Sequence, residues 1–204
     1  MLRHVFEANI GFRLSKKKEL WLDAGILPSH IGFETAVTTS NNTLTRSIAA
    51  DNSPYYETGV KLGYTTPNGH VQFSTLLLNG WQRIKRATGN KSISAGTQIT
   101  FIPNEKITLN WSSFLGNDKP DSVRQTRFFN NFYAVFTPHS RWNITAGFDI
   151  GWQKKLSGAG NDKWLTPVFV VQYKASNQWS IAARGEYYSD KNHVIIQPDI
   201  RSNA

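Results

Sequence analysis

The sequence predicts an all-β protein: an antiparallel up-and-down transmembrane β-barrel, of which this chain carries an incomplete set of strands. Apolar and polar residues alternate with a period of two through nearly the whole chain, and helical periodicity is almost absent. Aromatic residues gather at the ends of the alternating segments, and the connections between segments alternate between short and long. We expect about ten strands here, of at least about twelve in the complete barrel.

The composition predicts one folded domain covering residues 1–204, and the pattern of connections described below leads us to expect that it is truncated at both ends. The chain has 23 Lys plus Arg and 14 Asp plus Glu, a net charge of +9, and no cysteine. The lack of cysteine excludes a disulfide framework, thiolate zinc sites and cysteine catalysis. No apolar run approaches the ~18 residues of a transmembrane helix, and the first residues lack the apolar core of a signal peptide.

The strands are expected in order at 6–14, 20–26 and 56–64, and then from near residues 71, 93, 107, 128, 142, 165 and 179. The polar faces are rich in Gly, Ser, Thr, Asn and Gln, whereas the apolar faces carry no charged residue within a strand. The charges expected on the polar faces are Glu7, Arg13, Asp23, Glu57, Lys61, Arg127, Asp149, Arg184 and Glu186. A soluble sandwich would turn its apolar faces inward and a membrane barrel would turn them to lipid, so alternation alone leaves both open.

The placement of the aromatic residues favours the barrel. Trp142 and Trp152 bracket one strand, and ten steps of ~3.3 Å tilted by ~45° rise ~23 Å, close to the ~25 Å apolar band of outer-membrane barrels. The predicted membrane-interface girdle comprises Trp21, Tyr64, Trp81, Trp142, Trp152, Trp164, Tyr173, Trp179 and Tyr187. The alternative is a sandwich core with aromatic residues at its rim.

The connections also favour the barrel. Those at 15–19, 65–69, 103–105, 137–141 and 175–178 are short, whereas those at 28–54, 82–90, 116–125, 154–163 and from 189 onward are long. Bacterial barrels have short periplasmic turns and longer external loops. This pattern places Met1 and Ala204 on the external side, so we expect at least one further strand before Leu2 and one after Tyr188.

The charges of the polar faces nearly cancel, so the excess positive charge lies mainly in the connections. Most of these cations surround the long connections, where they would attract anions or lipopolysaccharide phosphates; a solvated loop set is the alternative. Nucleic acid is disfavoured because the basic residues are not interleaved with exposed aromatic residues. No hydrolase, P-loop, dinucleotide or zinc-protease motif occurs, and the five histidines have no metal-ligand spacing. We therefore predict no enzymatic activity, no cofactor and no metal.

The long connection at 28–54 is the main candidate for a functional site. One or two helical turns are expected at 43–50, capped by Thr43 or Thr45. The loop could fold into the barrel and narrow it, or it could pack across the mouth; the second is slightly favoured because loops usually lie at surfaces. In the first case, Glu34, Arg46, Asp51 and Lys61 would set a transverse field. The candidate pore-lining residues are His30, Glu34, Arg46, Asp51, Glu57, Lys61, Asp23, Arg127, Asp149, Arg184 and Glu186. Among these, Glu57 with Lys61 and Arg184 with Glu186 could simply pair along the wall.

Three stretches resemble a known family: LDAGILPSHIGFE at 22–34, LTRSIAADNSPYYETG at 44–59 and LNGWQRI at 78–84. They are similar to the β-barrel porin-2 (OmpL-like) family, common in Bacteroidetes, and the resemblance covers essentially the whole chain as an interior portion. It implies an outer-membrane channel and assigns no catalytic residue.

The leading interpretation is a porin of the bacterial outer membrane that passes small polar solutes by passive diffusion, with mild anion preference. Its expected partners are outer-membrane lipid, lipopolysaccharide and the solutes. Two alternatives remain: a plugged barrel acting as a surface adhesin or binding protein, and a soluble all-β ligand binder. The sequence does not indicate the oligomeric state.

Overall fold

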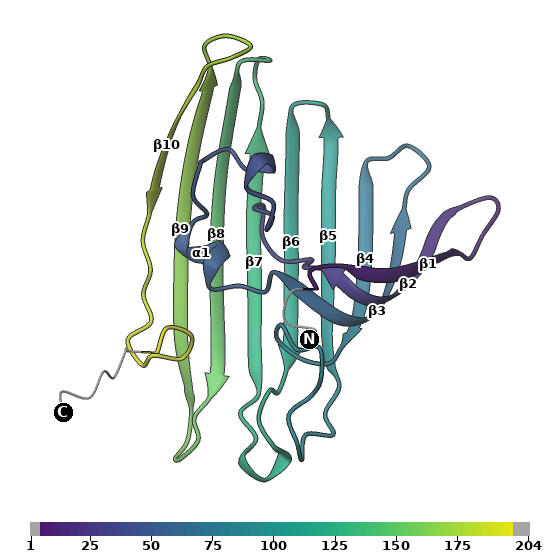
Figure 1. The fold of residues 1–204 in the computed structure, drawn as a ribbon, viewed down its shortest axis with the longest axis vertical. Coiled ribbons are helices and arrows are strands. Elements are labelled where there is room, and N and C mark those ends of the chain that lie inside the picture. Colours follow the sequence, from purple (N-terminus) through teal and green to yellow (C-terminus); the bar gives the residue numbers. More distant parts are fainter. Residues whose placement is uncertain (1–4, 198–204) are drawn as a thin grey trace.

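The computed structural model describes residues 5–197 as one antiparallel sheet in which each strand pairs with its neighbours in sequence (Figure 1). The ten strands are β1 (Ala8–Arg13), β2 (Glu19–Pro28), β3 (Tyr56–Thr65), β4 (Val71–Leu78), β5 (Ser94–Asn104), β6 (Ile107–Gly116), β7 (Arg127–Phe136), β8 (Trp142–Lys154), β9 (Asn161–Lys174) and β10 (Ser180–Glu186). The predicted all-β, up-and-down fold class is confirmed. β1 and β10 form the two edges of an open sheet, and the predicted positions of Met1 and Ala204 lie outside the described residues.

The predicted alternation of connections is present, with one difference. β8 and β9 stay in register from Trp142 opposite Tyr173 to Lys154 opposite Asn161. The connection between them is therefore only residues 155–160, shorter than the predicted 154–163. Gly158 and Gly160 adopt positive φ angles of 81° and 98° and close this turn.

The two faces of the sheet differ in the way expected of a membrane barrel. The outward face carries large apolar side chains that are exposed, for example Leu77 at 58% and Phe169 at 51%. Polar side chains on the opposite, inner face are buried, including Ser112, Asn131 and Thr145. A soluble sandwich requires the reverse arrangement, so the structure does not support that alternative.

One row of polar residues crosses the outward face. Thr75, Thr97, Ser113 and Asn130 lie opposite one another on β4, β5, β6 and β7. The hydroxyl oxygens of Thr97 and Ser113 are 2.6 Å apart, and the indole N–H of Trp111 donates to the Asn130 side-chain oxygen at 3.0 Å. Because lipid offers no hydrogen-bond partners, these contacts make a polar row tolerable on an apolar face.

In the described part of the chain, helical structure is limited to short segments: η2 (Thr38–Ser40), α1 (Ile48–Asp51) and η3 (Asp121–Val123). The helix predicted at 43–50 forms only at its C-terminal end. Its N-cap is Ser47, whose hydroxyl accepts from the backbone N–H of Ala50 at 3.2 Å; the prediction of Thr43 or Thr45 as the cap is wrong. Among residues 5–197, no helix is long and apolar enough to cross a membrane.

Candidate functional site

The connection between β2 and β3, residues 29–55, crosses the inner face of the sheet; we call it the inner loop. Hydrogen bonds join it to β3, β5, β6, β7, β8, β9 and β10. In Figure 1 this segment, with α1, lies over β7, β8 and β9. It is therefore attached to the wall along its length.

The middle of the inner loop reaches the end of the wall where the short connections lie. The Asn42 side-chain amide donates to Asn143 at 3.0 Å, and Gln172 donates to the Asn42 carbonyl at 3.0 Å. Asn143 is the second residue of β8, and Gln172 is near the end of β9. The preferred prediction, that the loop packs across the mouth, is wrong. The loop folds inward because the wall offers polar partners throughout its height.

The first anchor of the inner loop is a buried pair between His30 and Glu57. The His30 Nδ1 atom lies 2.5 Å from a Glu57 carboxylate oxygen, and Nε2 lies 2.8 Å from the Ser113 carbonyl. The His30 carbonyl accepts from Gln98 at 2.9 Å and from the Ser112 hydroxyl at 2.7 Å. Burial alone would lower the pKa of His30, but the carboxylate of Glu57 outweighs it and the pKa is raised. Because both ring nitrogens face acceptors, the site suits the imidazolium form beside a carboxylate.

This pair predicts that the fold loses stability as the pH rises above about 6.5. A raised folded-state pKa means that the pair stabilises the fold fully below the unfolded-state value of about 6.5, and that this stability is lost as the pH rises through the folded-state pKa of His30. Of the charged groups facing His30, Glu57 raises its pKa and Lys61 lowers it. We expect the free energy of unfolding, measured by urea titration, to fall over this pH range. The same decline in a His30→Gln variant would assign it to other groups.

Two glycines in the wall make room for the inner loop. A Cβ atom on Gly96 would lie 2.7 Å from the His30 ring, and one on Gly147 would lie 2.5 Å from the Phe33 ring. Both distances are too short for a real Cβ atom, so any residue other than glycine at either position would force the ring to move. Gly96 and Gly147 therefore mark two positions where the loop presses on the wall.

Replacing Gly147 with alanine is expected to push Phe33 off the wall and to destabilise the fold by about 1–3 kcal/mol. The matched control is Gly63→Ala, because a Cβ there meets only the Ser74 hydroxyl, at 3.7 Å. Urea titration of the two folded variants measures the difference. Equal free energies of unfolding for Gly147→Ala and Gly63→Ala would show that Phe33 moves away from the added methyl group without destabilising the fold.

The second anchor is a chain of buried polar groups on β7 and β8. The backbone N–H of Gly32 donates to the Asn131 side-chain oxygen at 3.1 Å. The Asn131 amide in turn donates to Asp149 at 2.6 Å, and both side chains are buried. Asp149, predicted to line the pore, is covered and reaches the loop through Asn131.

The third anchor lies on β10 and holds the start of α1. The Glu186 carboxylate accepts from the backbone N–H of Ile48 at 2.7 Å, and Arg184 donates to the Thr45 carbonyl at 2.5 Å. Arg184 and Glu186 also pair with each other at 3.0 Å. Glu34 reinforces this end of the loop by accepting from the backbone N–H of Ser47 at 2.9 Å.

The remaining wall charges pair differently from the predicted arrangement. Lys61 lies directly opposite Asp23 in the β2–β3 register and pairs with it at 3.1 Å. The predicted Glu57–Lys61 pair is wrong, because His30 from the loop takes Glu57. Arg46 pairs within the loop, with Asp51 at 3.2 Å.

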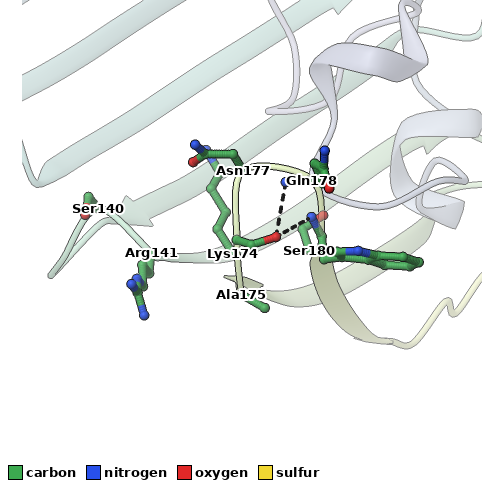
Figure 2. Close-up of a pocket in the computed structure, with 9 residues that line it drawn as sticks. Ser140, Arg141, Lys174, Ala175, Asn177, Gln178 and Ser180 are labelled. Atoms are coloured by element: carbon green, nitrogen blue, oxygen red, sulfur yellow. Dashed lines mark hydrogen bonds between the residues drawn. The ribbon is translucent and has the colours of Figure 1, made fainter.

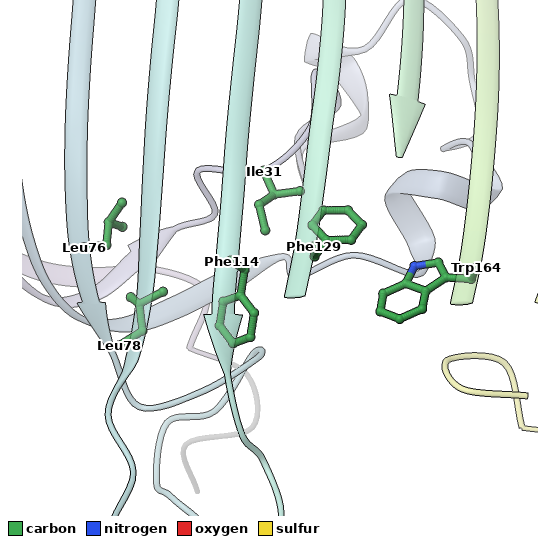
Figure 3. Close-up of a cluster of buried hydrophobic side chains, with 6 residues drawn as sticks. All are labelled: Ile31, Leu76, Leu78, Phe114, Phe129 and Trp164. Carbon is green, nitrogen blue, oxygen red and sulfur yellow. The ribbon is translucent and has the colours of Figure 1, made fainter. Parts of the chain in front are cut away.

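A cluster of buried apolar side chains lies at the long-connection end of the inner face (Figure 3). Its members are Ile31, Leu76, Leu78, Phe114, Phe129 and Trp164. Trp81 packs edge-to-face on Phe114 and Phe129, and the Arg127 guanidinium lies 5.0 Å from the Trp81 ring centre. Arg127 also pairs with Asp118 at 3.3 Å. Tyr188, Val194 and Ile195 cover this cluster from the segment after β10.

The membrane-interface prediction is wrong for three of the nine girdle residues. Trp81 and Trp164 belong to the interior cluster just described. Trp21 is on the inner face, because it alternates with Leu20 and Leu22 and shares the face of Asp23. Four others lie on the outward face near strand ends: Tyr64, Trp142, Trp152 and Tyr173. Trp179 and Tyr187 are exposed just outside the two ends of β10. Contact of these six residues with a membrane interface remains a prediction.

A separate cleft of about 640 Å³ lies between two short connections, those after β7 and β9 (Figure 2). Its lining residues are exposed and lie in these turns or at the adjoining strand ends, with Arg141 and Lys174 as the charged members. We place no site there, because no buried polar group converges on it. Within residues 5–197, no group of three His, Asp or Glu side chains could hold a metal ion.

Sequence reasoning missed the neutral side chains that hold the inner loop, namely Gln98, Ser112, Asn131, Asn143 and Gln172. Their position on the polar face was visible from the alternation. Nothing in the sequence separated a residue that binds the loop from one that lines open water.

Comparison with known proteins agrees with the geometry. A family model described as "beta-barrel porin-2, OmpL-like" matches residues 1–203. No curated protein and no solved structure matches the chain. With its open up-and-down sheet, outward apolar face and inward polar face, the chain belongs to the β-barrel porin-2 (OmpL-like) family.

Proposed function

We propose that the protein is an outer-membrane porin through which small polar solutes diffuse passively, and that the inner loop forms its constriction. The observation that carries the proposal is the attachment of this loop along the inner face, down to Asn143 and Gln172. A loop held in this way narrows the space beside it, and the polar wall keeps passing ions hydrated. Outward apolar side chains support placement in lipid.

The same proposal includes a mild anion preference. Charges within the barrel pair off as Asp23–Lys61, Arg46–Asp51 and Arg184–Glu186, so they leave little transverse field. The unbalanced cations lie in the long connections or beside them on the adjoining strands: Arg83, Lys85, Arg86, Lys91, Lys119, Arg124, Lys154 and Lys163, whereas Lys155 pairs with Asp162 at 3.7 Å. They would concentrate anions, and would bind lipopolysaccharide phosphates, at the mouth.

Shortening the inner loop is expected to widen the pore. In a variant of the full-length protein with residues 35–45 replaced by a short Gly-Ser linker, single-channel conductance in a planar bilayer should rise about twofold or more, because conductance follows the narrowest section. In a salt gradient, the reversal potential should indicate anion preference in both proteins. Unchanged conductance in the shortened variant would mean that the loop does not limit the current.

A plugged barrel with a surface-binding role is the second candidate. It is favoured by the segment after β10, whose Tyr188, Val194 and Ile195 cover the interior cluster. A correctly folded, heat-modifiable barrel that gives no conductance steps would support this role over the porin.

A further inference from the structure

A cavity of about 250 Å³ lies between the two ends of the inner loop and the wall at β7. Aromatic side chains of Phe33, Tyr55 and Tyr133 line it together with Arg46 and Glu34. This volume corresponds to ~8 water molecules. Neither His30 nor Arg184 lines the cavity, and neither the constriction nor the girdle accounts for it.

Arg46 is held rigidly but is not fully hydrogen-bonded. Its side chain is 10% exposed, Nε donates to Asp51 at 3.2 Å, and Nη2 donates to the Ala50 carbonyl at 2.6 Å. The guanidinium carbon lies 4.0 Å from the centre of the Tyr55 ring. The remaining nitrogen, Nη1, is buried and has no partner in the described part of the chain. A buried donor without an acceptor is uncommon and calls for an acceptor from elsewhere.

Two other polar groups of the cavity have unused hydrogen-bonding capacity. One Glu34 carboxylate oxygen is bonded to Ser47, and the other has no partner among residues 5–197. The Tyr133 hydroxyl likewise has none there, although its ring packs edge-to-face on Phe33 at 5.9 Å. The cavity therefore presents a donor, an acceptor and a hydroxyl between aromatic rings.

We propose that this cavity is a binding subsite for a neutral, polyhydroxylated ring of monosaccharide size. Arg46 is already neutralised by Asp51, and Glu34 adds a negative charge, so a free anion is disfavoured. A cation is also disfavoured, because it would face the N–H groups of the positively charged Arg46 guanidinium at Nη1. Sugar hydroxyls accept from Nη1 and donate to Glu34, while the apolar ring faces pack on Tyr55 and Phe33. As a transport subsite it rests on the porin function proposed above.

Equilibrium dialysis of radiolabelled glucose against the full-length, detergent-folded protein tests the subsite without requiring current flow. We expect saturable binding by the wild type, its loss in Arg46→Gln, and binding about fivefold weaker in Tyr133→Phe, which removes one hydrogen bond outside the loop. Arg141→Gln, which changes an exposed cation in the short connection after β7, should bind as the wild type does. The heat-modifiable band shift checks the folding of each variant.

No saturable binding by the wild type would overturn the subsite and leave a solvent-filled cavity. If Tyr133→Phe and Arg46→Gln both bound glucose as tightly as the wild type does, the glucose site would lie elsewhere. Competition by glycine or inorganic phosphate, but not by unlabelled glucose, would overturn the ligand class. Glucose binding without conductance would refute the porin function and support the subsite. Conductance without glucose binding would support the porin function and refute the subsite.

Discussion

Replacing Glu57 with alanine is expected to lower the free energy of unfolding by about 3–5 kcal/mol and to release the start of the inner loop. The substitution leaves the His30 imidazole buried beside an empty space, without the carboxylate that lies 2.5 Å from it. His30 also presents its carbonyl to Gln98 and Ser112, so its displacement breaks those contacts as well. Urea titration of the lipid-folded, full-length protein measures the loss.

The matched control is Asp23→Ala on the neighbouring strand. Asp23 also pairs with a cation, Lys61, but this pair remains partly exposed, so we expect a loss of no more than about 1 kcal/mol. Glu57→Ala should also increase single-channel conductance, because the loop loses its first anchor, whereas Asp23→Ala should not. Similar losses in the two variants would mean that the buried pair is not the anchor.

The strands could be predicted from the sequence because the two faces of a barrel wall meet different surroundings. The alternation from Trp142 to Trp152, for example, places Asp149 inward and Ile150 outward, as found. The same parity argument would have corrected Trp21 and Trp164, which alternate with the outward residues beside them. The girdle prediction rests on position at a strand end, and that position does not specify which face of the sheet a side chain is on.

The path of the inner loop could not be predicted, because its partners are far away in sequence. Asn42 contacts Asn143, and Gly32 contacts Asn131. Such pairs depend on loop closure over the whole wall and leave no local pattern. The inward glycines Gly96 and Gly147 were the nearest available signal, since a wall that lines only water has no need of small residues at those positions.

Because the inner loop binds to the wall, some of the charged side chains on the inner face hold the loop and do not face the interior. Glu57 and Glu186 are two of the candidate pore-lining residues, but both are engaged with the loop, through His30 and Ile48. Asp23 and Lys61 stay partly open to the interior. The polar wall thus has two uses in this family member, one that fastens the loop and one that faces the remaining space.

Replacing Asn131 with leucine is the second substitution with a large expected effect. It removes the amide that donates to Asp149 at 2.6 Å and the oxygen that accepts from Gly32 at 3.1 Å. The Asp149 carboxyl is buried and has no other hydrogen-bond partner in the described residues. Because a buried polar group without a partner costs about 1–3 kcal/mol and two are created, we expect a loss of about 2–5 kcal/mol in urea titration.

A double-mutant cycle separates the polar chain from simple repacking. If the loss comes from the stranded carboxyl, the Asn131→Leu/Asp149→Leu double variant should recover most of it, since replacing both partners with apolar groups leaves only the Gly32 N–H unsatisfied. Additive losses would mean that the two side chains act independently and that packing against the inner loop dominates. Recovery would establish that Asn131 carries the coupling between the wall and the loop, with Asp149 as the group that it must satisfy.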